Sequence, residues 1–195
     1  MMIVVENEKR FVDLVQHNPI NGIILDRLSH LRLPNSYLVA GCLFQTVWNV
    51  LSGNDPAQGI NDYDVFYFDQ SDTSWEAEDI AIQSGREAFR DLDVDVQIRN
   101  QARVHLWYQE KFGVGCEPLV SSEDGIDHFL NQSSCFGLRK MIGGNEVYAP
   151  FGYEDLFSMI VRPNRRRALP DVYYAKANRW KSVWPELRVI PWNGE

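Results

Sequence analysis

The chain has 195 residues, of which 45% are hydrophobic and 12% aromatic, and it carries a formal net charge of −8 at pH 7. This length is enough to bury a core without disulfides or a structural metal, and no apolar run is long enough to span a bilayer. The acidic charge disfavours long nucleic acid as a partner, because nonspecific binding depends on neutralising phosphates, but it does not exclude a local basic patch. The first ten residues mix acidic and basic side chains and lack a secretory signal pattern, so we expect a cytoplasmic protein.

The N-terminal part of the chain is predicted to alternate helices with two strands. The first five elements are helix, helix, strand, helix and strand, over residues 6–17, 19–32, 37–40, 42–53 and 60–69. Apolar side chains at helical spacing identify the first two helices, and Pro19 separates them. Gly41 lets the chain turn directly from the first strand into the third helix, which Gly53 ends.

The rest of the chain adds a third strand, a hairpin and further helices. These elements are a helix, a strand, two helices, a hairpin and two helices, over residues 73–90, 93–99, 100–113, 121–130, 135–150, 153–161 and 170–183. Thr73 and Glu76 form a capping box that starts the first of these helices. The run Gly143-Gly144-Asn145 marks the hairpin. Helices flanking a few strands predict an α/β or α+β fold rather than a doubly wound sheet.

The strand INDYDVFYFD, residues 60–69, begins with acids at alternate positions. Successive strand side chains point to opposite faces, so Asp62 and Asp64 share one face, with Cα atoms roughly 7 Å apart. Like charges this close raise one pKa unless a cation lies between them. A divalent metal site is one interpretation of this pair, and solvated carboxylates at a strand end are the other.

The strand over residues 93–99 repeats this polarity, with Asp95 and Gln97 on one face and apolar side chains on the other. If the two strands adjoin, Asp95 meets Asp62 and Asp64 at one edge of a small sheet. Three such acids suit Mg²⁺, which prefers hard oxygen ligands, and a pair of ions roughly 4 Å apart stabilises the attacking and leaving oxygens of a displacement. The helix start beside Cys42 offers backbone N–H groups to a triphosphate.

Several segments together resemble the polymerase-β-like nucleotidyltransferase superfamily, whose pattern is a small-residue turn, a helix, an Asp-x-Asp strand and a third acidic strand. A family of short bacterial proteins classed as nucleotidyltransferases is similar over about residues 37 to 192, through the segments AGCLFQTVWNVLSG, INDYDVFYFD, RNQARVHLWY, SSEDGIDHF, VYAPFGYEDLF and VRPN. The resemblance implies the superfamily fold, with a small mixed sheet flanked by helices and a C-terminal hairpin and helices. It also implies a divalent cofactor, Mg²⁺ or Mn²⁺.

The resemblance assigns roles residue by residue. Asp62 and Asp64 correspond to the metal-binding pair, and Gly41 with Cys42 corresponds to the turn, which is usually Gly-Gly or Gly-Ser. Asp95 corresponds to the third catalytic and metal-binding acid. Position 97, where relatives carry Glu, is the alternative place for that acid, and this chain has Gln97 there. Cys42 also departs from the pattern, because a thiol replaces a hydroxyl or an absent side chain.

Candidate substrate-binding residues flank the turn and the third strand: Gly41, Cys42, Gln97, Arg99, Asn100 and Arg103. The last three either reach a triphosphate or acceptor, or cap a helix and pair with acids. The densest basic run contains Arg162, Arg165, Arg166 and Arg167. This run is either a clamp for polyphosphate or RNA, or a solvated loop.

Two functions fit this sequence. The first is transfer of a nucleoside monophosphate from a nucleoside triphosphate to an unidentified hydroxyl acceptor by a two-metal mechanism, with a small molecule or protein hydroxyl favoured over long RNA. The second is a catalytically inactive nucleotide-binding or protein-interaction module, indicated by Cys42 and Gln97. We expect a single domain of residues 1–195, with a core of about 35–112 and a C-terminal extension of about 113–195. The nucleotide, the acceptor and the oligomeric state stay open.

Overall fold

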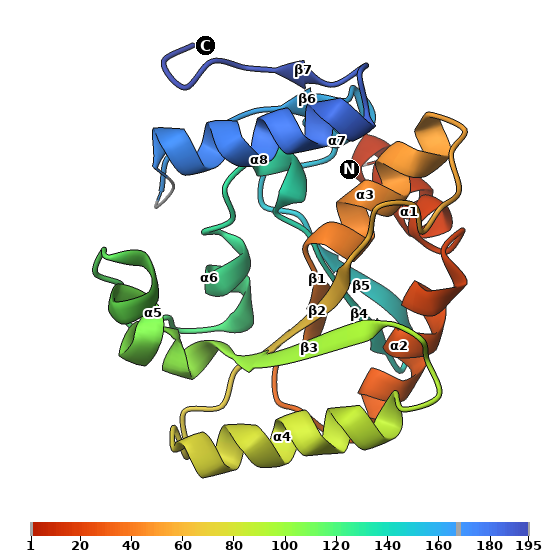
Figure 1. Cartoon of the computed structure of the whole chain (residues 1–195). Coiled ribbons are helices and arrows are strands. Elements are labelled where there is room, and N and C mark those ends of the chain that lie inside the picture. The colour runs from red at the N-terminus through yellow and green to blue at the C-terminus, as the bar shows by residue number, and fades with distance from the viewer. Residues whose placement is uncertain (1, 167–168, 195) are drawn as a thin grey trace.

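A computed structural model describes residues 2–166 and 169–194 and has the predicted α+β character (Figure 1). Its helices are α1 (Met2–Val15), α2 (Pro19–Leu31), α3 (Gly41–Leu51), α4 (Trp75–Ala88), α5 (Val104–Phe112), α6 (Ser122–Ile126), α7 (Glu154–Phe157) and α8 (Pro170–Val183). Its strands are β1 (Tyr37–Val39), β2 (Asp62–Tyr67), β3 (Asp95–Asn100), β4 (Gly137–Met141), β5 (Gly144–Tyr148), β6 (Ile160–Val161) and β7 (Arg188–Val189). Among the described residues, none of these helices has the length and apolar character to cross a bilayer.

The main sheet has five strands in the order β3-β2-β1-β4-β5. β1 pairs antiparallel with both β2 and β4, whereas β2 and β3 run parallel, so the predicted small mixed sheet is confirmed. The hairpin β4–β5 joins the same sheet, because Leu38 of β1 pairs with Leu138 of β4. The sheet therefore contains strands from both the predicted core and the predicted C-terminal extension. The division of the chain into a core of about 35–112 and an extension of about 113–195 stays a prediction.

The alternation in β2 explains how this strand positions polar groups. Tyr63, Val65 and Tyr67 are buried in the main hydrophobic core, while the side chains between them are only partly buried. A one-residue shift would exchange the two faces, so burial of the three apolar positions fixes the register of the strand. Asp62 and Asp64 consequently share one face, as predicted, and it is the face opposite the main core.

Three local predictions need correction. Ser74, rather than Thr73, caps α4, because the Ser74 hydroxyl accepts the Ala77 N–H at 3.2 Å. The hairpin turn consists of residues 142–143, since Met141 already pairs with Gly144. The helix predicted over 153–161 is only the short α7, and residues 160–161 instead form β6, which pairs in parallel with β7. Strands of two residues are too short to give a periodic signal.

Candidate active site

The chain turns from β1 into α3 through a residue with an unusual backbone conformation. Ala40 has φ 63° and ψ −135°, and Gly41 is the first residue of the helix. The residue with positive φ is therefore Ala40, one position before the predicted turn residue. The Ala40 carbonyl accepts the N–H groups of Leu43 and Phe44 at 3.1 and 3.4 Å. The first N–H groups of a helix have no intrahelical acceptor, and Gly41 lines the cavity described below, so its N–H is a candidate to meet a ligand.

The Cys42 side chain does not face this ligand position. It is fully buried, and its Sγ donates a hydrogen bond to the Val39 carbonyl at 3.2 Å. Burial, followed by the charges of Asp64 and Asp62, raises the pKa of the thiol well above its ordinary value. The thiol therefore packs in the core and does not contact the cavity. Because the whole residue is buried and does not line the cavity, binding of substrate by Cys42 stays a prediction from the sequence.

Asp62 and Asp64 lie on the wall of a cavity of about 480 Å³, together with Ala40 and Gly41. Burial and the neighbouring Asp62 raise the pKa of Asp64 to about 6, while Lys176 and Arg99 act in the opposite direction. This agrees with the expectation that two like charges on one strand face raise one pKa. A cation placed beside the pair would relieve that electrostatic cost.

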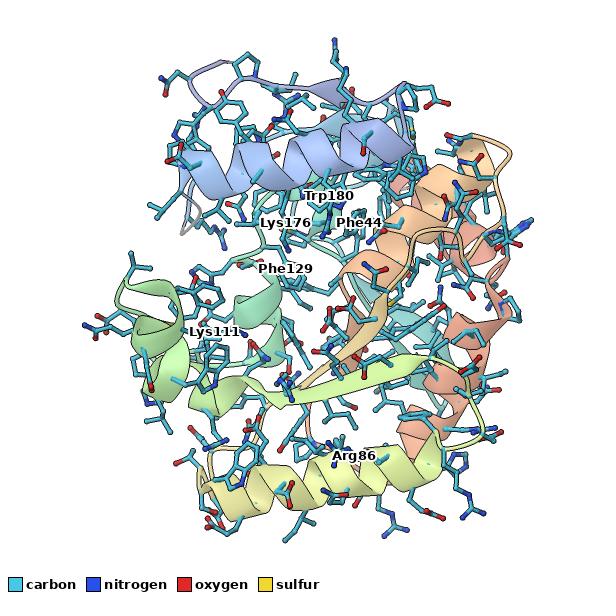
Figure 2. All side chains as sticks on the ribbon, viewed as in Figure 1. Phe44, Arg86, Lys111, Phe129, Lys176 and Trp180 are labelled. Atoms are coloured by element: carbon cyan, nitrogen blue, oxygen red, sulfur yellow. The ribbon has the colours of Figure 1, made fainter. Side chains whose placement is uncertain are left out.

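Two cations of α8, Lys176 and Arg179, line the same cavity, and the sequence patterns did not identify either. Figure 2 shows Lys176 and Trp180 on the side of α8 that faces Phe44 and Phe129. Desolvation and the charge of Arg179 lower the pKa of Lys176, whereas Asp64 and Asp62 raise it. The acid pair therefore faces a positive helix, which is a suitable arrangement for an anion that carries its own metal ion.

Trp180 adds an aromatic wall to this cavity. Its ring packs edge-on against Phe44 and Trp48, with centroid distances of 5.3 and 6.0 Å. The side chain is only 5% exposed, and its Nε1–H meets no acceptor among the described residues. Buried donors normally have partners. The nitrogen itself is buried, so Trp180 contributes its ring to the cavity wall, and its Nε1–H is not exposed to the cavity in this structure.

Asp95 does not join the acid pair in this structure. The β2–β3 register places Asp62 opposite Asp95 and Asp64 opposite Gln97. The Asp95 carboxylate accepts a hydrogen bond from Gln97 Nε2 at 2.7 Å, and it lines a separate hollow between β3 and α4. Within residues 2–166 and 169–194, no three His, Cys, Asp or Glu side chains are grouped to hold a metal. The predicted adjacency of the two strands is confirmed, and the charge of Asp95 contributes to the raised pKa of Asp64. Asp95 as a third metal ligand stays a prediction.

Asn100 and Arg103, predicted to bind substrate, instead stabilise the end of β3. Asn100 is buried, and its side chain accepts the Ala102 and Asp69 N–H groups, both at 3.1 Å. Arg103 is 9% exposed and forms a buried ion pair with Glu78. Arg99 is exposed, and its charge acts on Asp64. The alternative interpretation, capping and charge pairing, is therefore correct for Asn100 and Arg103.

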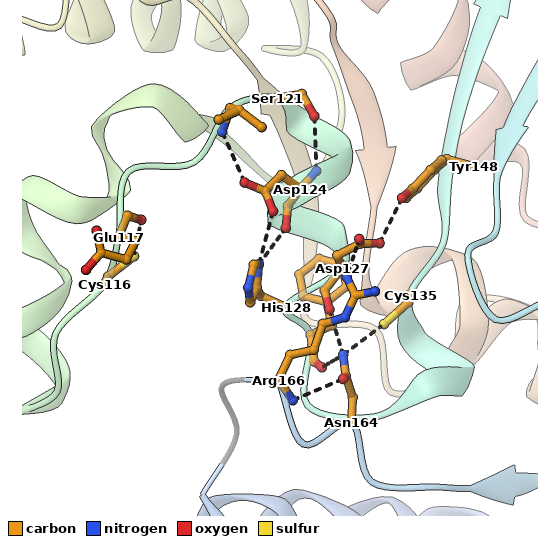
Figure 3. A network of polar contacts seen from close by, with 12 residues as sticks. Cys116, Glu117, Ser121, Asp124, Asp127, His128, Cys135, Tyr148, Asn164 and Arg166 are labelled. Carbon is orange, nitrogen blue, oxygen red and sulfur yellow. Dashed lines mark hydrogen bonds and ion pairs between the residues drawn. The ribbon is translucent and has the colours of Figure 1, made fainter.

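The basic run near residue 165 is used for internal contacts rather than as a clamp. Arg162 pairs with Asp155 at 2.7 Å, and Arg166 pairs with Asp127 (Figure 3). Arg165 donates to the carbonyls of Trp192 and Gly194, as the described part of the chain shows. Arg167 lies outside the described residues. Arg165 and Arg166 are exposed and lie in a turn, which agrees with the solvated-loop interpretation. The guanidinium groups of all three arginines also fix the C-terminal segment to the body of the protein.

The network in Figure 3 also positions part of the cavity wall. Asn164 Nδ2 donates to the carbonyls of Asp127 and Phe129 at 2.7 and 2.8 Å. The Tyr148 hydroxyl donates to Asp127 at 2.8 Å. These bonds join β5 to the Asp127 side chain, and they join the segment before α8 to the backbone of Asp127 and Phe129. Phe129 lines the cavity that contains the acid pair.

Comparisons with known proteins agree with the α+β fold. A family model described as Nucleotidyltransferase matches residues 26–189. A solved structure titled "The NMR structure of the protein reveals a CCA-adding enzyme head domain" is 26% identical, with a TM-score of 0.68. The similarity covers 86% of this chain and 87% of the other. No curated protein matches the chain.

Proposed function

This chain belongs to the nucleotidyltransferase family matched over residues 26–189, and we propose that it moves a nucleoside monophosphate from a nucleoside triphosphate to a hydroxyl group with the help of Mg²⁺ or Mn²⁺. One observation carries this proposal. Asp62 and Asp64 share a cavity of about 480 Å³ with Lys176 and Arg179 of α8. Carboxylates for a metal and cations for a polyphosphate thus line one cavity of the size that small-molecule sites usually have.

The acid pair fits a divalent ion. Mg²⁺ is commonly bound by one or two carboxylates together with substrate phosphates and water, so Asp62 and Asp64 suffice as protein ligands. The raised pKa of Asp64 supports this, because a cation stabilises the ionised form that burial disfavours. When bound, divalent ions stabilise the charge on the attacking and leaving oxygens. Asp95 stays a proposed third ligand, which has to exchange its hydrogen bond with Gln97 for the metal.

The other residues of the cavity are proposed to hold the nucleotide. Gly41 lines the cavity at the start of α3, where backbone donors and the helix dipole favour phosphate. Lys176 and Arg179 supply positive charge from α8. Trp180 offers its aromatic ring. Residues from both the N-terminal and the C-terminal parts of the chain are therefore needed for this site.

Replacing Lys176 by Met tests the nucleotide part of this proposal. Loss of one charge-assisted contact should weaken the affinity for a Mg²⁺–nucleoside triphosphate by about 10- to 100-fold, while the affinity for Mn²⁺ alone changes little. Calorimetric titration with each of the common triphosphates measures both quantities. Lys9→Met is the matched control, because Lys9 is an exposed lysine of α1 paired with Asp13. Equal triphosphate affinities of wild type and Lys176→Met would contradict this placement.

The acid pair also predicts how metal affinity depends on pH. Metal ligands must be deprotonated, and the pKa of Asp64 is about 6 in the folded protein. Lowering the pH from about 7.5 to about 5 should therefore weaken Mn²⁺ binding roughly tenfold. Electron paramagnetic resonance of free Mn²⁺ measures this binding without nucleotide. A Mn²⁺ affinity that stays constant over this range would rule out Asp64 as a ligand, and Asp93→Asn, a change at an exposed acid, should leave the profile unaltered.

A further inference from the structure

A second cavity, of about 350 Å³, adjoins the cavity of the acid pair. The two cavities share Phe129, Leu130 and Lys176 as lining residues. Phe66 also lines the second cavity, and it follows Asp64 by two positions on the same face of β2. The space beside the acid pair therefore continues along the strand into a separate compartment.

The second cavity has mostly apolar and aromatic walls. α5 contributes Trp107, Tyr108 and Phe112, and Leu119 follows α5 in the chain. The ring centroids of Tyr108 and Phe112 are 4.6 Å apart, and the ring centroids of Trp107 and Tyr108 are 6.1 Å apart. Phe112 is 51% exposed although it belongs to this aromatic cluster. Exposed apolar clusters that border a cavity are typical of ligand sites.

Positive charge lies at the borders of this apolar compartment. Arg99 and Lys176 both line it, and Lys176 is shared with the cavity of the acid pair. On α5, the Lys111 Nζ lies 5.4 Å from the ring centroids of both Trp107 and Phe112, and Figure 2 labels this lysine. An occupant with a flat apolar body and an anionic group would find complementary partners for both parts.

We propose that this second cavity binds the acceptor, and that the acceptor is a small molecule with a flat apolar body, an anionic group and a hydroxyl directed toward Asp62 and Asp64. This inference rests on the proposed function. In the reaction, the acceptor oxygen forms a bond to the α-phosphorus of the triphosphate. The bond from that phosphorus to the bridging oxygen breaks, pyrophosphate leaves with the bonding electrons, and the hydroxyl proton passes to water.

A small acceptor fits the charge distribution better than a polynucleotide does. Binding a nucleic acid strand requires a positive groove that follows its backbone, and the protein has a net charge of −8. Arg162 and Arg166, from the densest basic run, are occupied by Asp155 and Asp127. The cations near the aromatic cluster match one anionic group rather than a row of phosphates.

The test uses anilinonaphthalene sulfonate, a flat apolar anion whose fluorescence rises in apolar sites. Wild-type protein should bind it saturably at one site, and Trp107→Ala and Phe112→Ala should each weaken this binding at least fivefold. Ile80→Ala is the control, because Ile80 is a 69% exposed apolar residue on α4, outside the cavity. Far-ultraviolet circular dichroism checks that each variant is folded. Unchanged binding in Trp107→Ala and in Phe112→Ala would overturn the inference.

An inhibition experiment tests the acceptor assignment separately from the proposed function. The probe should inhibit pyrophosphate release competitively against a small hydroxyl acceptor and non-competitively against the triphosphate. Transfer to RNA ends that the probe does not inhibit would overturn the acceptor assignment and leave the proposed function standing. No pyrophosphate release with any acceptor or triphosphate would overturn the proposed function and the acceptor assignment together, even if the probe binds.

Discussion

Replacing Asp64 by Asn should abolish nucleotidyl transfer and at the same time stabilise the metal-free protein. Removing a metal ligand forfeits several kcal/mol of transition-state stabilisation, which corresponds to a loss of about 10³-fold or more in rate. The amide keeps the shape of the side chain and removes its charge. Because burial and Asp62 disfavour the ionised carboxyl, the free energy of unfolding should rise by on the order of 1–3 kcal/mol at neutral pH.

The stability that Asp64→Asn adds to the metal-free protein depends on pH between the unfolded-state and the folded-state pKa of Asp64. The folded-state pKa of Asp64 is raised to about 6 from an ordinary value of 3.8, so the native state binds this proton more tightly than the unfolded state does. Wild-type stability should therefore fall as the pH rises through that window, and the full cost should be present above it. Urea unfolding of metal-free wild type and variant at both ends of the window measures the difference. A variant that transfers at the wild-type rate would remove Asp64 from the mechanism.

Replacing Glu78 by Gln should destabilise the protein by about 3–5 kcal/mol, because it breaks a buried ion pair and leaves one charge uncompensated. Glu78 is 3% exposed, and its Oε2 pairs with Arg103. Its Oε1 accepts the Asn100 N–H at 2.8 Å. The substitution therefore removes the counter-charge of Arg103 at the point where β3 ends. Urea unfolding followed by tryptophan fluorescence measures the loss.

A double variant distinguishes the structural role of Arg103 from a substrate-binding role. Glu78→Gln combined with Arg103→Leu should recover much of the lost stability, since no unpaired charge then remains buried. Triphosphate affinity should stay at the wild-type level in this double variant. A stable double variant that no longer binds triphosphate would restore the sequence-based assignment of Arg103 to the substrate.

Local patterns were sufficient to predict most of the elements and the acid pair. Asp62 and Asp64 belong to one strand, and the alternation of that strand alone fixes their shared face. Pro19 marks the start of α2, where its missing N–H is harmless, and Asn18 caps the same helix. Such features depend on neighbours within a few positions, so the sequence contains all the information that they require.

The rest of the site depends on contacts between distant segments. In α8, burial of Tyr173, Ala177 and Trp180 can be anticipated from helical spacing, but the element that this face packs against cannot. Lys176 and Arg179 reach the acid pair only through that packing. The roles of the C-terminal arginines are likewise set by acids on other elements. Sequence spacing therefore predicted the acidic residues of this cavity, Asp62 and Asp64, and missed its two cations.

The most direct test of the central claim is mass spectrometry of products. Purified wild-type protein and Asp64→Asn are incubated with each nucleoside triphosphate, Mg²⁺ or Mn²⁺, and an extract that contains small metabolites and RNA. We expect a wild-type product that is heavier than its acceptor by one nucleoside monophosphate, accompanied by pyrophosphate and absent from the variant. Metal-dependent triphosphate binding by the wild type without any such product would contradict catalysis and favour a nucleotide-binding module.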